Sequence, residues 1–247
     1  MRVPGSDRLA KWLEPLPPAM VLALARAVAR PRRLAPYPGW HCGIDYYAEP
    51  LGPRLRTAIW KYCNERGMQS PVRMRFYGGL RVYTYIGNDI SQCLFVGGCY
   101  EPNEFAFLDS FLDRGMAFVD VGANEGLYAL FAASKVGNEG RVLALEPSRR
   151  EYERLRDNLL LNRLRNVKPL RLAAADFNGT ARLRVAGYKH EGHNMLGEMA
   201  YEVELSHEEE VEARLLDDIL AEEGIDRVDA AKIDVEGAEE AVLRGMA

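Results

Sequence analysis

The fold of this chain is decided by residues 118–126, which read FVDVGANEG. An apolar strand runs into a loop with a glycine at each end, and an apolar helix begins at about residue 125. Glycine is favoured where the backbone bends sharply and approaches a ligand closely. The stretch therefore predicts a strand, a nucleotide-type binding loop and a helix, in that order.

Strands and helices alternate outward from this stretch. Apolar runs predict strands at 117–121, 141–146, 167–173 and 229–234, and helical spacing predicts helices from about 125, at 149–162 and at 215–223. Such alternation is typical of parallel strands joined by right-handed crossovers, with helices on both faces of the sheet. The predicted fold class is therefore α/β, a Rossmann-like, doubly wound, mostly parallel sheet. Residues 180–211 interrupt the pattern and predict a hairpin or a mobile loop.

The part of the chain before residue 117 predicts helices and a hairpin. A short amphipathic helix is expected at 20–29, and a second helix at 101–112. Residues 72–85 predict a hairpin in which Gly78-Gly79 forms a tight two-residue turn. Pairing around that turn places five side chains on one face: Val72, Met74, Phe76, Tyr83 and Tyr85. We expect an accessory segment at 1–71 and the main domain at 72–247.

The composition limits the classes of partner and the cellular compartment that we expect for this protein. The 247 residues include 32 basic and 36 acidic side chains, a net charge of -4, which lacks the basic excess of a nucleic-acid-binding protein. The longest apolar run, 19–25, is too short to span a bilayer. Four cysteines without a CxxC pair favour reduced thiols, so we predict a cytoplasmic protein. The first forty residues are locally basic, and they could serve as a targeting peptide or contact a membrane surface. Because the apolar run there is short and contains Arg26, plain packing is the favoured expectation, and the oligomeric state stays open.

The binding loop favours a ligand with little negative charge. Its pattern Gly122-x-Asn124-x-Gly126 differs from the GxGxxG of pyrophosphate-binding loops, and Glu125 at the helix entrance would repel phosphates. Asp120, at the end of the strand, is suited to a positively charged group such as the ammonium of an amino acid. Alternatively, Asp120 has only a structural role and caps a helix or a loop.

The second strand ends at Glu146, which is followed by a proline. Glu146 lies 20 residues after Gly126. An acidic side chain at this spacing accepts hydrogen bonds from a ribose diol. A surface glutamate before a turn is the alternative, and NAD would satisfy this feature equally well. Taken together, the loop and Glu146 predict an adenosine-containing ligand at the carboxyl ends of the strands.

Three stretches together resemble a known family. They are FVDVGANEG at 118–126, Glu146-Pro147, and KIDVEGAE at 232–239. They are similar to the FkbM-type methyltransferases, a branch of the class I enzymes that use S-adenosylmethionine. The resemblance extends upstream through GNDIS at 87–91 and GCYEP at 98–102, includes Asn158 and Asn162, and covers the chain from about Met74 onward.

The resemblance implies methyl transfer from S-adenosylmethionine, usually to a hydroxyl of a sugar, polyketide or related metabolite, so the partner would be a small-molecule or glycan acceptor. It implies that four residues line the methionine part of the cofactor: Asp120, Gly122, Asn124 and Gly126. Glu146 would hold the ribose, and Asp176, which follows the third strand, would bind the adenine. The alternative for Asp176 is a purely structural place in a turn.

The resemblance also places the fourth strand beside the first, which brings Asp234 and Glu236 near the donor methyl and the acceptor. We expect Asp234 on the cofactor side and Glu236 facing the acceptor as candidate catalytic residues, with helix capping as the alternative. Lys232 lies inside that strand and needs an acidic partner, for which Asp120 is the candidate. Histidines at 190, 193 and 207 would allow a divalent metal, but their spacing is not diagnostic and none is expected.

Relatives of this type continue past the fourth strand with three further strands, so the sequence is expected to be truncated after it. Two other functions stay open. A nicotinamide-dependent oxidoreductase would share Glu146 and the glycine loop, and a non-catalytic S-adenosylmethionine-binding module would share the whole site. Calorimetry with S-adenosylhomocysteine and NAD distinguishes a methyltransferase from the oxidoreductase. A labelled methyl-transfer assay distinguishes an active enzyme from the non-catalytic binding module.

Overall fold

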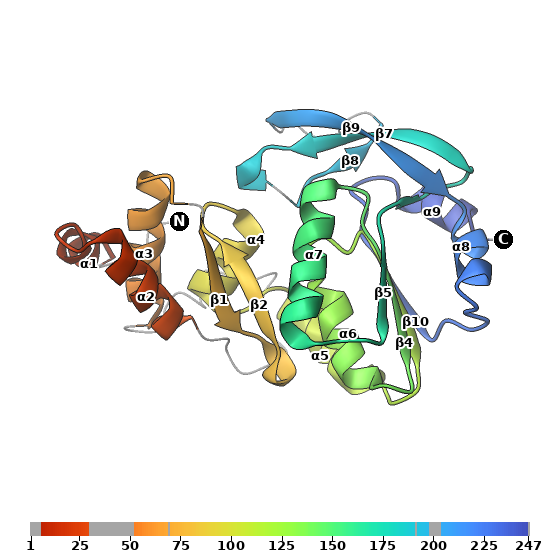
Figure 1. Ribbon diagram of the computed structural model, residues 1–247, viewed down its shortest axis with the longest axis horizontal. Helices are drawn as coiled ribbons and strands as arrows, with labels where there is room; N and C mark the ends of the chain where they lie inside the picture. Colours follow the sequence, from red (N-terminus) through yellow and green to blue (C-terminus); the bar gives the residue numbers. More distant parts are fainter. Residues whose placement is uncertain (1–5, 30–51, 69, 191, 198–203, 247) are drawn as a thin grey trace. The chain divides into compact units, whose positions relative to one another are not determined.

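The computed structural model describes residues 6–29, 52–68, 70–190, 192–197 and 204–246 (Figure 1). The chain divides into two compact units, Met1–Phe107 and Leu108–Ala247. The hairpin that the sequence analysis assigned to the start of the main domain lies in the first of these units.

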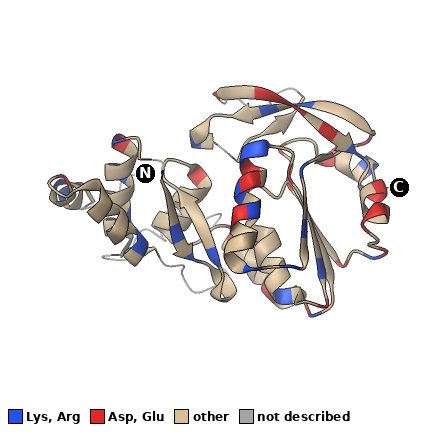
Figure 2. Cartoon of the chain, viewed as in Figure 1, with Lys and Arg blue, Asp and Glu red and all other residues tan. Residues whose placement is uncertain are grey.

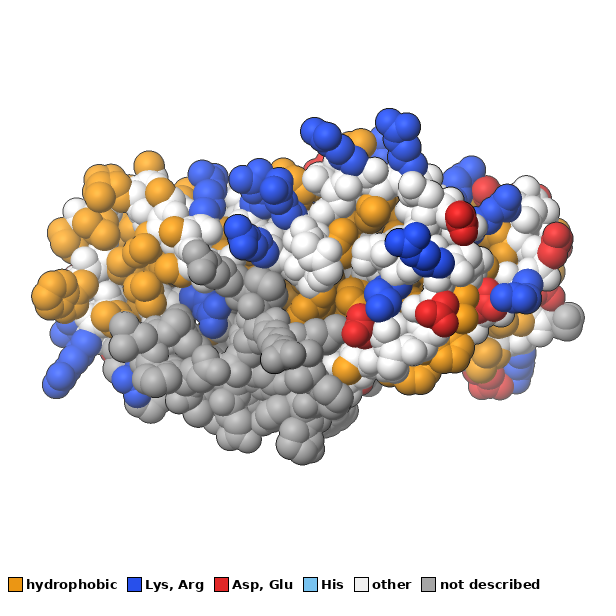
Figure 3. All heavy atoms as spheres, turned by 90° about the horizontal axis from the view of Figure 1, so that it is seen from below, with side chains coloured by type: hydrophobic (Ala, Val, Ile, Leu, Met, Phe, Trp, Pro, Cys, Tyr) orange, Lys and Arg blue, Asp and Glu red, His pale blue; other side chains and the backbone are white. Residues whose placement is uncertain are grey.

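The first unit is built from helices and one antiparallel hairpin. Its elements are α1 (Ser6–Leu13), α2 (Pro18–Val28), α3 (Gly52–Glu65), β1 (Pro71–Arg75), β2 (Arg81–Tyr85), α4 (Asp89–Gln92), a π-helical turn at Cys93–Gly97, and the start of α5 (Pro102–Phe111). Val21 and Ala25 of α2 are fully buried, as expected for an amphipathic helix. Hydrophobic side chains also gather on the surface over α1 and α2 (Figure 3), and Trp12 and Met20 are exposed.

The hairpin forms with a different register from the one predicted. Met74 pairs with Val82 and Val72 with Thr84, so Val82 and Thr84 share the buried face with Val72 and Met74. The prediction that Tyr83 and Tyr85 lie on this face was wrong. The turn is one residue longer than expected: Phe76 donates to Leu80, around the short 3-10 turn Tyr77–Gly79. Since successive strand residues point to opposite faces, a shift by one exchanges the faces.

The second unit contains the predicted parallel sheet. Its strands are β3 (Ala117–Val121), β4 (Arg141–Leu145), β5 (Val167–Leu170) and β10 (Ala230–Ile233), all parallel, in the order β10-β3-β4-β5. From β3 the chain moves outward to β4 and β5, then returns to the other side of β3. Ligands in such sheets bind at the carboxyl ends of the strands where the order reverses. That point lies between β3 and β10.

Helices cover both faces of the sheet, namely α6 (Leu127–Val136), α7 (Arg149–Asn162), α8 (Leu216–Glu222) and α9 (Glu239–Arg244). Val119 and Val121 of β3 pack into one cluster with Ile219 of α8 and Val242 of α9. The alternate residue Asp120 points to the other face, where its carboxylate meets α6. This confirms the α/β class with a parallel sheet. Charged side chains of both signs are interspersed along α7 (Figure 2).

A second, mainly antiparallel sheet is inserted between β5 and α8. Its strands are β6 (Ala173–Ala174), β7 (Gly179–Ala186), β8 (Met195–Leu196) and β9 (Leu205–Arg214), in the order β6-β9-β7-β8. The predicted hairpin is confirmed as β7 and β9. The third parallel strand is shorter than predicted: it ends at Leu170, and Ala173 pairs with Ala213 in the second sheet instead.

Three of the four cysteines lie in the described part of the chain. Cys63, Cys93 and Cys99 are free thiols, and burial raises the pKa of Cys63 to about 11. Cys42 lies outside the described residues. Among the described helices, none combines the length and apolar character needed to span a bilayer.

Candidate functional site

The loop after β3 turns tightly because alternate residues adopt a left-handed backbone. Gly122, Asn124 and Gly126 have φ values of 75°, 50° and 85°. A Cβ on Gly122 would lie 2.0 Å from the carbonyl oxygen of Asp234, and one on Gly126 would lie 2.3 Å from Leu155 Cδ1. Backbone conformation therefore favours glycine at both positions, and at Gly122 the neighbouring backbone oxygen also leaves no space for a side chain. The loop after β10 lies directly against the loop after β3.

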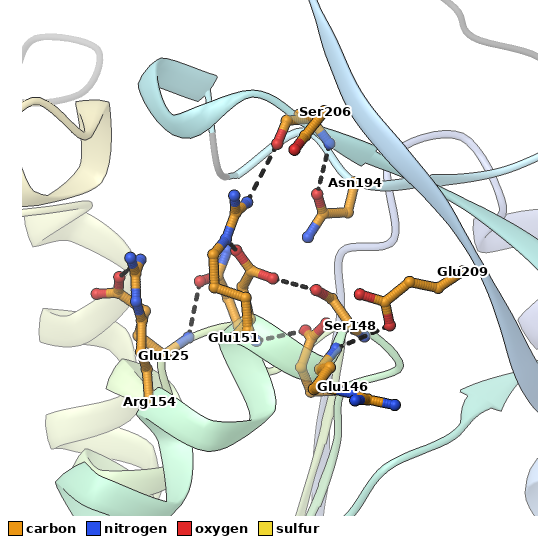
Figure 4. A network of polar contacts seen from close by, with 12 residues as sticks. Glu125, Glu146, Ser148, Glu151, Arg154, Asn194, Ser206 and Glu209 are labelled. Carbon is orange, nitrogen blue, oxygen red and sulfur yellow. Dashed lines mark hydrogen bonds and ion pairs between the residues drawn. The ribbon is translucent and has the colours of Figure 1, made fainter.

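Glu146 connects the end of β4 to this loop. Its two carboxylate oxygens accept the backbone N–H groups of Asn124 (2.8 Å) and Ser148 (2.9 Å), and its side chain is buried (Figure 4). Burial and the nearby Glu151 raise the pKa of Glu146 to about 8, against the lowering effect of the two backbone N–H groups. Each oxygen keeps a second lone pair for a further donor, such as a ribose hydroxyl.

A polar network supports Glu146 from the start of α7. The Ser148 hydroxyl donates to the buried carboxylate of Glu151, and Arg150 Nε donates to the same carboxylate at 2.6 Å (Figure 4). Ser148 and Glu151 were not among the residues predicted for the site. Their spacing, a serine three residues before a glutamate at the start of a helix, is that of a capping box and would have indicated them.

Glu125 does not point outward from the helix entrance. Its side chain is buried, and its Oε1 accepts from Arg154 Nη1 of α7 at 2.8 Å (Figure 4). Asn158 of α7 donates to the Glu125 backbone carbonyl at 2.9 Å. The expectation that Glu125 repels a phosphate was wrong, because an arginine from the neighbouring helix compensates its charge. The exclusion of a pyrophosphate ligand therefore rests only on the glycine spacing.

Asp120 caps α6 and faces Lys232. One of its carboxylate oxygens accepts the backbone N–H of Ala129 at 2.9 Å, which is the capping role considered as its alternative. Lys232 Nζ lies 3.9 Å from the other oxygen, so the predicted ion pair is present. The closer contacts of Lys232 are the Gly122 carbonyl (2.9 Å) and Asp234 (3.1 Å). Lys232 thus holds the loops after β3 and β10 together.

We expect Lys232→Met to lower the free energy of unfolding by about 1–3 kcal/mol, because it removes the cation that compensates buried Asp120. Lys168→Met is the matched control: this lysine lies in β5, is mostly exposed and pairs with the partly buried Glu223 at 3.1 Å. The control should change stability by no more than about 0.5 kcal/mol. Urea unfolding of both variants measures the difference. Equal losses of unfolding free energy would mean that Lys232 does not hold the two loops together.

The structure places the two candidate catalytic residues in the loop after β10. The Asp234 backbone N–H donates to the Val121 carbonyl at 3.1 Å, which continues the pairing of β10 with β3. Glu236 follows with a φ of 52° and lies 3.6 Å from His193 Nδ1. Asp234 is therefore close to the end of β3, and Glu236 lies two residues further along the same loop. Asp176 is exposed, in the turn after β6, and its role toward an adenine stays a prediction.

The three histidines considered as metal ligands are divided between two places. The rings of His190 and His193 lie 6.0 Å apart between centroids, in the turn before β8. His207, in β9, contacts Ser206 and Glu209, both at 3.1 Å.

The fold and the site define a class of protein. A doubly covered parallel sheet with a left-handed glycine loop after its first strand and a buried glutamate after its second is typical of proteins that bind an adenosine-containing cofactor. The Methyltransferase FkbM domain family matches residues 120–247, just over half of the chain. The chain therefore belongs to the FkbM methyltransferase family, a family of S-adenosylmethionine-dependent enzymes.

Named relatives agree with this assignment. The chain is 30% identical over 154 residues to Methyltransferase sdnD of Sordaria araneosa, covering 52% of this chain and 59% of that protein. It is 27% identical over 172 residues to Methyltransferase 1 of Beauveria bassiana, covering 64% of this chain and 66% of that protein. The chain thus spans roughly three-fifths of the length of these relatives.

Solved structures also resemble parts of the chain. An S-adenosylmethionine-dependent O-methyltransferase of Thermotoga maritima is 23% identical and matches with a TM-score of 0.29, covering 44% of this chain and 43% of that one. A Streptococcus mutans protein in complex with S-adenosylhomocysteine is 18% identical with a TM-score of 0.26, covering 28% and 38%.

Proposed function

We propose that this chain binds S-adenosylmethionine and transfers its methyl group to a hydroxyl oxygen of a small-molecule or glycan acceptor. The observation that carries the proposal is the meeting of three strand ends. Gly122 after β3 lies against Asp234 after β10, and Glu146 after β4 binds the Asn124 amide of the same loop. Membership of the FkbM family supports the cofactor and the type of reaction.

Each site residue has a proposed part in this binding. Glu146 binds the ribose diol through the free lone pairs of its anchored carboxylate. The loop after β3 surrounds the methionine part, Asp176 serves the adenine, and Asp234 and Glu236 face the donor methyl and the acceptor. The loop residues concerned are Asp120, Gly122, Asn124 and Gly126.

Positioning dominates the proposed catalysis. Methyl transfer needs the acceptor oxygen in line with the sulfur–methyl bond, and such positioning lowers a barrier by about 7–11 kcal/mol. A general base contributes about 10²–10⁴-fold, or roughly 3–5 kcal/mol. The contacts of Lys232 with the Gly122 carbonyl and with Asp234 keep the two loops in a fixed relation, which positioning requires.

Calorimetry with S-adenosylhomocysteine and NAD tests the cofactor. We expect one-to-one binding of S-adenosylhomocysteine and no heat with NAD. Glu146→Ala removes the contact to the diol and should weaken the affinity by about 10- to 150-fold. Glu210→Ala, at an exposed glutamate in β9, is the control and should leave the affinity unchanged. Unchanged affinity in Glu146→Ala would mean that Glu146 does not bind the ribose. Equal binding of NAD would refute the proposal that the cofactor is S-adenosylmethionine.

The acceptor requires a separate experiment. Labelled S-adenosylmethionine offered with sugars, polyketides and hydroxylated metabolites should give label on an oxygen of one of these classes. Label found only on a nitrogen or carbon of the acceptor would contradict the proposed O-methylation while leaving the cofactor site intact.

A further inference from the structure

Two acidic side chains meet at the start of α7, and one serine binds both of them (Figure 4). The Ser148 backbone N–H donates to Oε1 of Glu146 at 2.9 Å, and the Ser148 hydroxyl donates to Oε2 of Glu151. All three side chains are buried. Ser148 thus links the proposed ribose-binding carboxyl to a second carboxyl, which the proposed function does not use.

Both carboxylate oxygens of Glu151 are bound within the protein. Oε2 accepts from the Ser148 hydroxyl, and Oε1 accepts from Arg150 Nε at 2.6 Å. The contact with Arg150 is an ion pair, and it compensates the negative charge of Glu151. Because both oxygens are engaged and the side chain is fully buried, Glu151 can act on a bound ligand only through its neighbours.

The inserted sheet also binds the start of α7. Arg150 Nη2 donates to the Ala186 carbonyl, at the end of β7, at 3.2 Å. The Arg149 backbone N–H donates to Oε2 of Glu209 in β9 at 3.1 Å. Two strands of the inserted sheet therefore hold the first turn of α7, directly after Ser148. These contacts leave the side chain of Arg150, and with it Glu151, little freedom to rotate away from Ser148.

The charge of Glu151 opposes ionisation of Glu146. Burial is the largest cause of the raised pKa of Glu146, and the charge of Glu151 is the next. Within the described part of the chain, Glu151 of α7 and Lys232 of β10 are the charged side chains that act on Glu146, and Lys232 lowers its pKa. Removing one of two like charges from a buried site makes the other group easier to ionise. Glu151 therefore affects the proposed ribose carboxyl by its hydrogen bond and by its charge.

We propose that Glu151 is a positioning residue for the cofactor, which holds the Ser148 N–H on the Glu146 carboxyl and opposes ionisation of that carboxyl until a ribose binds. The inference rests on the proposed function, in which Glu146 accepts the hydroxyls of the ribose diol. When these hydroxyls donate to Glu146, they stabilise its charged form, and its proton passes to the buffer. The affinity for the cofactor then depends on pH, because binding includes the cost of removing this proton.

Calorimetry with S-adenosylhomocysteine between pH 7 and 9 tests the inference. The affinity of the wild type should rise by about tenfold over this range, because Glu146 titrates near pH 8. Glu151→Gln keeps an oxygen for the Ser148 hydroxyl but removes the negative charge, so Glu146 should ionise about one pH unit lower. The rise in affinity should then fall to about twofold. The proton release at pH 7 should fall from about 0.9 to about 0.5.

Two further variants complete the experiment. Glu153→Gln is the matched control, because this exposed glutamate lies two residues later in α7 and its substitution removes the same charge. It should keep the tenfold rise. Ser148→Ala removes the hydroxyl that binds Glu151 but leaves the charge of Glu151 in place. Its affinity at pH 9 should be about 3- to 10-fold weaker than that of the wild type, with the rise still about tenfold. The amine of S-adenosylhomocysteine titrates alike in all four proteins, so differences between them belong to the protein.

The failures of the two proposals can be distinguished. If the wild type does not bind S-adenosylhomocysteine, the proposed function is refuted, and the inference with it. If the wild type binds but Glu151→Gln keeps the tenfold rise, the cofactor site stands and Glu151 is only structural, even where the variant is less stable. Wild-type affinity for Ser148→Ala at pH 9, or a wild-type affinity that does not change with pH, would also overturn the inference. If Glu151→Gln does not fold, the comparison with Ser148→Ala decides.

Discussion

Gly122→Ala is expected to lower the free energy of unfolding by about 2–5 kcal/mol, the sum of left-handed strain and overpacking. Its φ is 75°, and the added Cβ would lie 2.0 Å from the Asp234 carbonyl oxygen. The loop after β10 would have to move away, which also separates Asp234 and Glu236 from the cofactor loop. Any folded Gly122→Ala protein should therefore lose S-adenosylhomocysteine binding.

Gly115→Ala distinguishes the cost of a left-handed backbone from the cost of a steric clash. Gly115 lies in the same unit with a φ of 83°, but an added Cβ would meet nothing within 4 Å. This variant should lose only about 1–2 kcal/mol, the cost of a left-handed alanine, and should bind S-adenosylhomocysteine normally. Urea unfolding and calorimetry of both variants provide the comparison. Equal stability losses and equal binding would mean that the two loops do not touch as described.

Cofactor binding is expected to release a proton from Glu146. With a pKa of about 8, this carboxyl is mostly protonated at pH 7 in the free protein. Ribose hydroxyls that donate to it favour the ionised form, so binding at pH 7 should release up to about 0.9 proton. Affinity should rise by about tenfold from pH 7 to 9 and then level off. Calorimetry in buffers of different ionisation enthalpy measures the released proton directly.

Glu146→Gln is the control for this linkage, because it keeps the shape of the side chain and cannot titrate. It should bind S-adenosylhomocysteine with no proton release and without the rise in affinity. The same carboxyl affects folding: its pKa is raised in the folded state, so it stabilises the protein below pH 4–5 and this contribution is lost as pH rises through about 8. Proton release that persists in Glu146→Gln would assign the linkage to another group.

Much of the parallel sheet could be predicted because its signals are local. The strand Ala117–Val121 and the helix Arg149–Asn162 have the predicted bounds, since each is an apolar pattern ended by a turn. The loop after β3 was predicted for the same reason: only residues that tolerate a left-handed backbone fit its alternate positions.

The features that could not be predicted depend on residues far apart in the sequence. Arg154 reaches Glu125 from the next helix, and His193 reaches Glu236 from an inserted sheet. No short-range pattern indicates either contact, because each exists only after the strands have assembled. The hairpin register failed for a smaller reason, since one extra residue in the turn exchanges the two faces.

The central claim is that the cofactor lies across the carboxyl ends of β3, β4 and β10. Hydrogen exchange measured with and without S-adenosylhomocysteine tests it most directly, because exchange slows where a ligand orders or covers the backbone. We expect protection in residues 122–126, 146–148 and 234–237, and unchanged exchange in the hairpin at 71–85. Protection absent from the first three segments, or confined to the hairpin, would contradict the account.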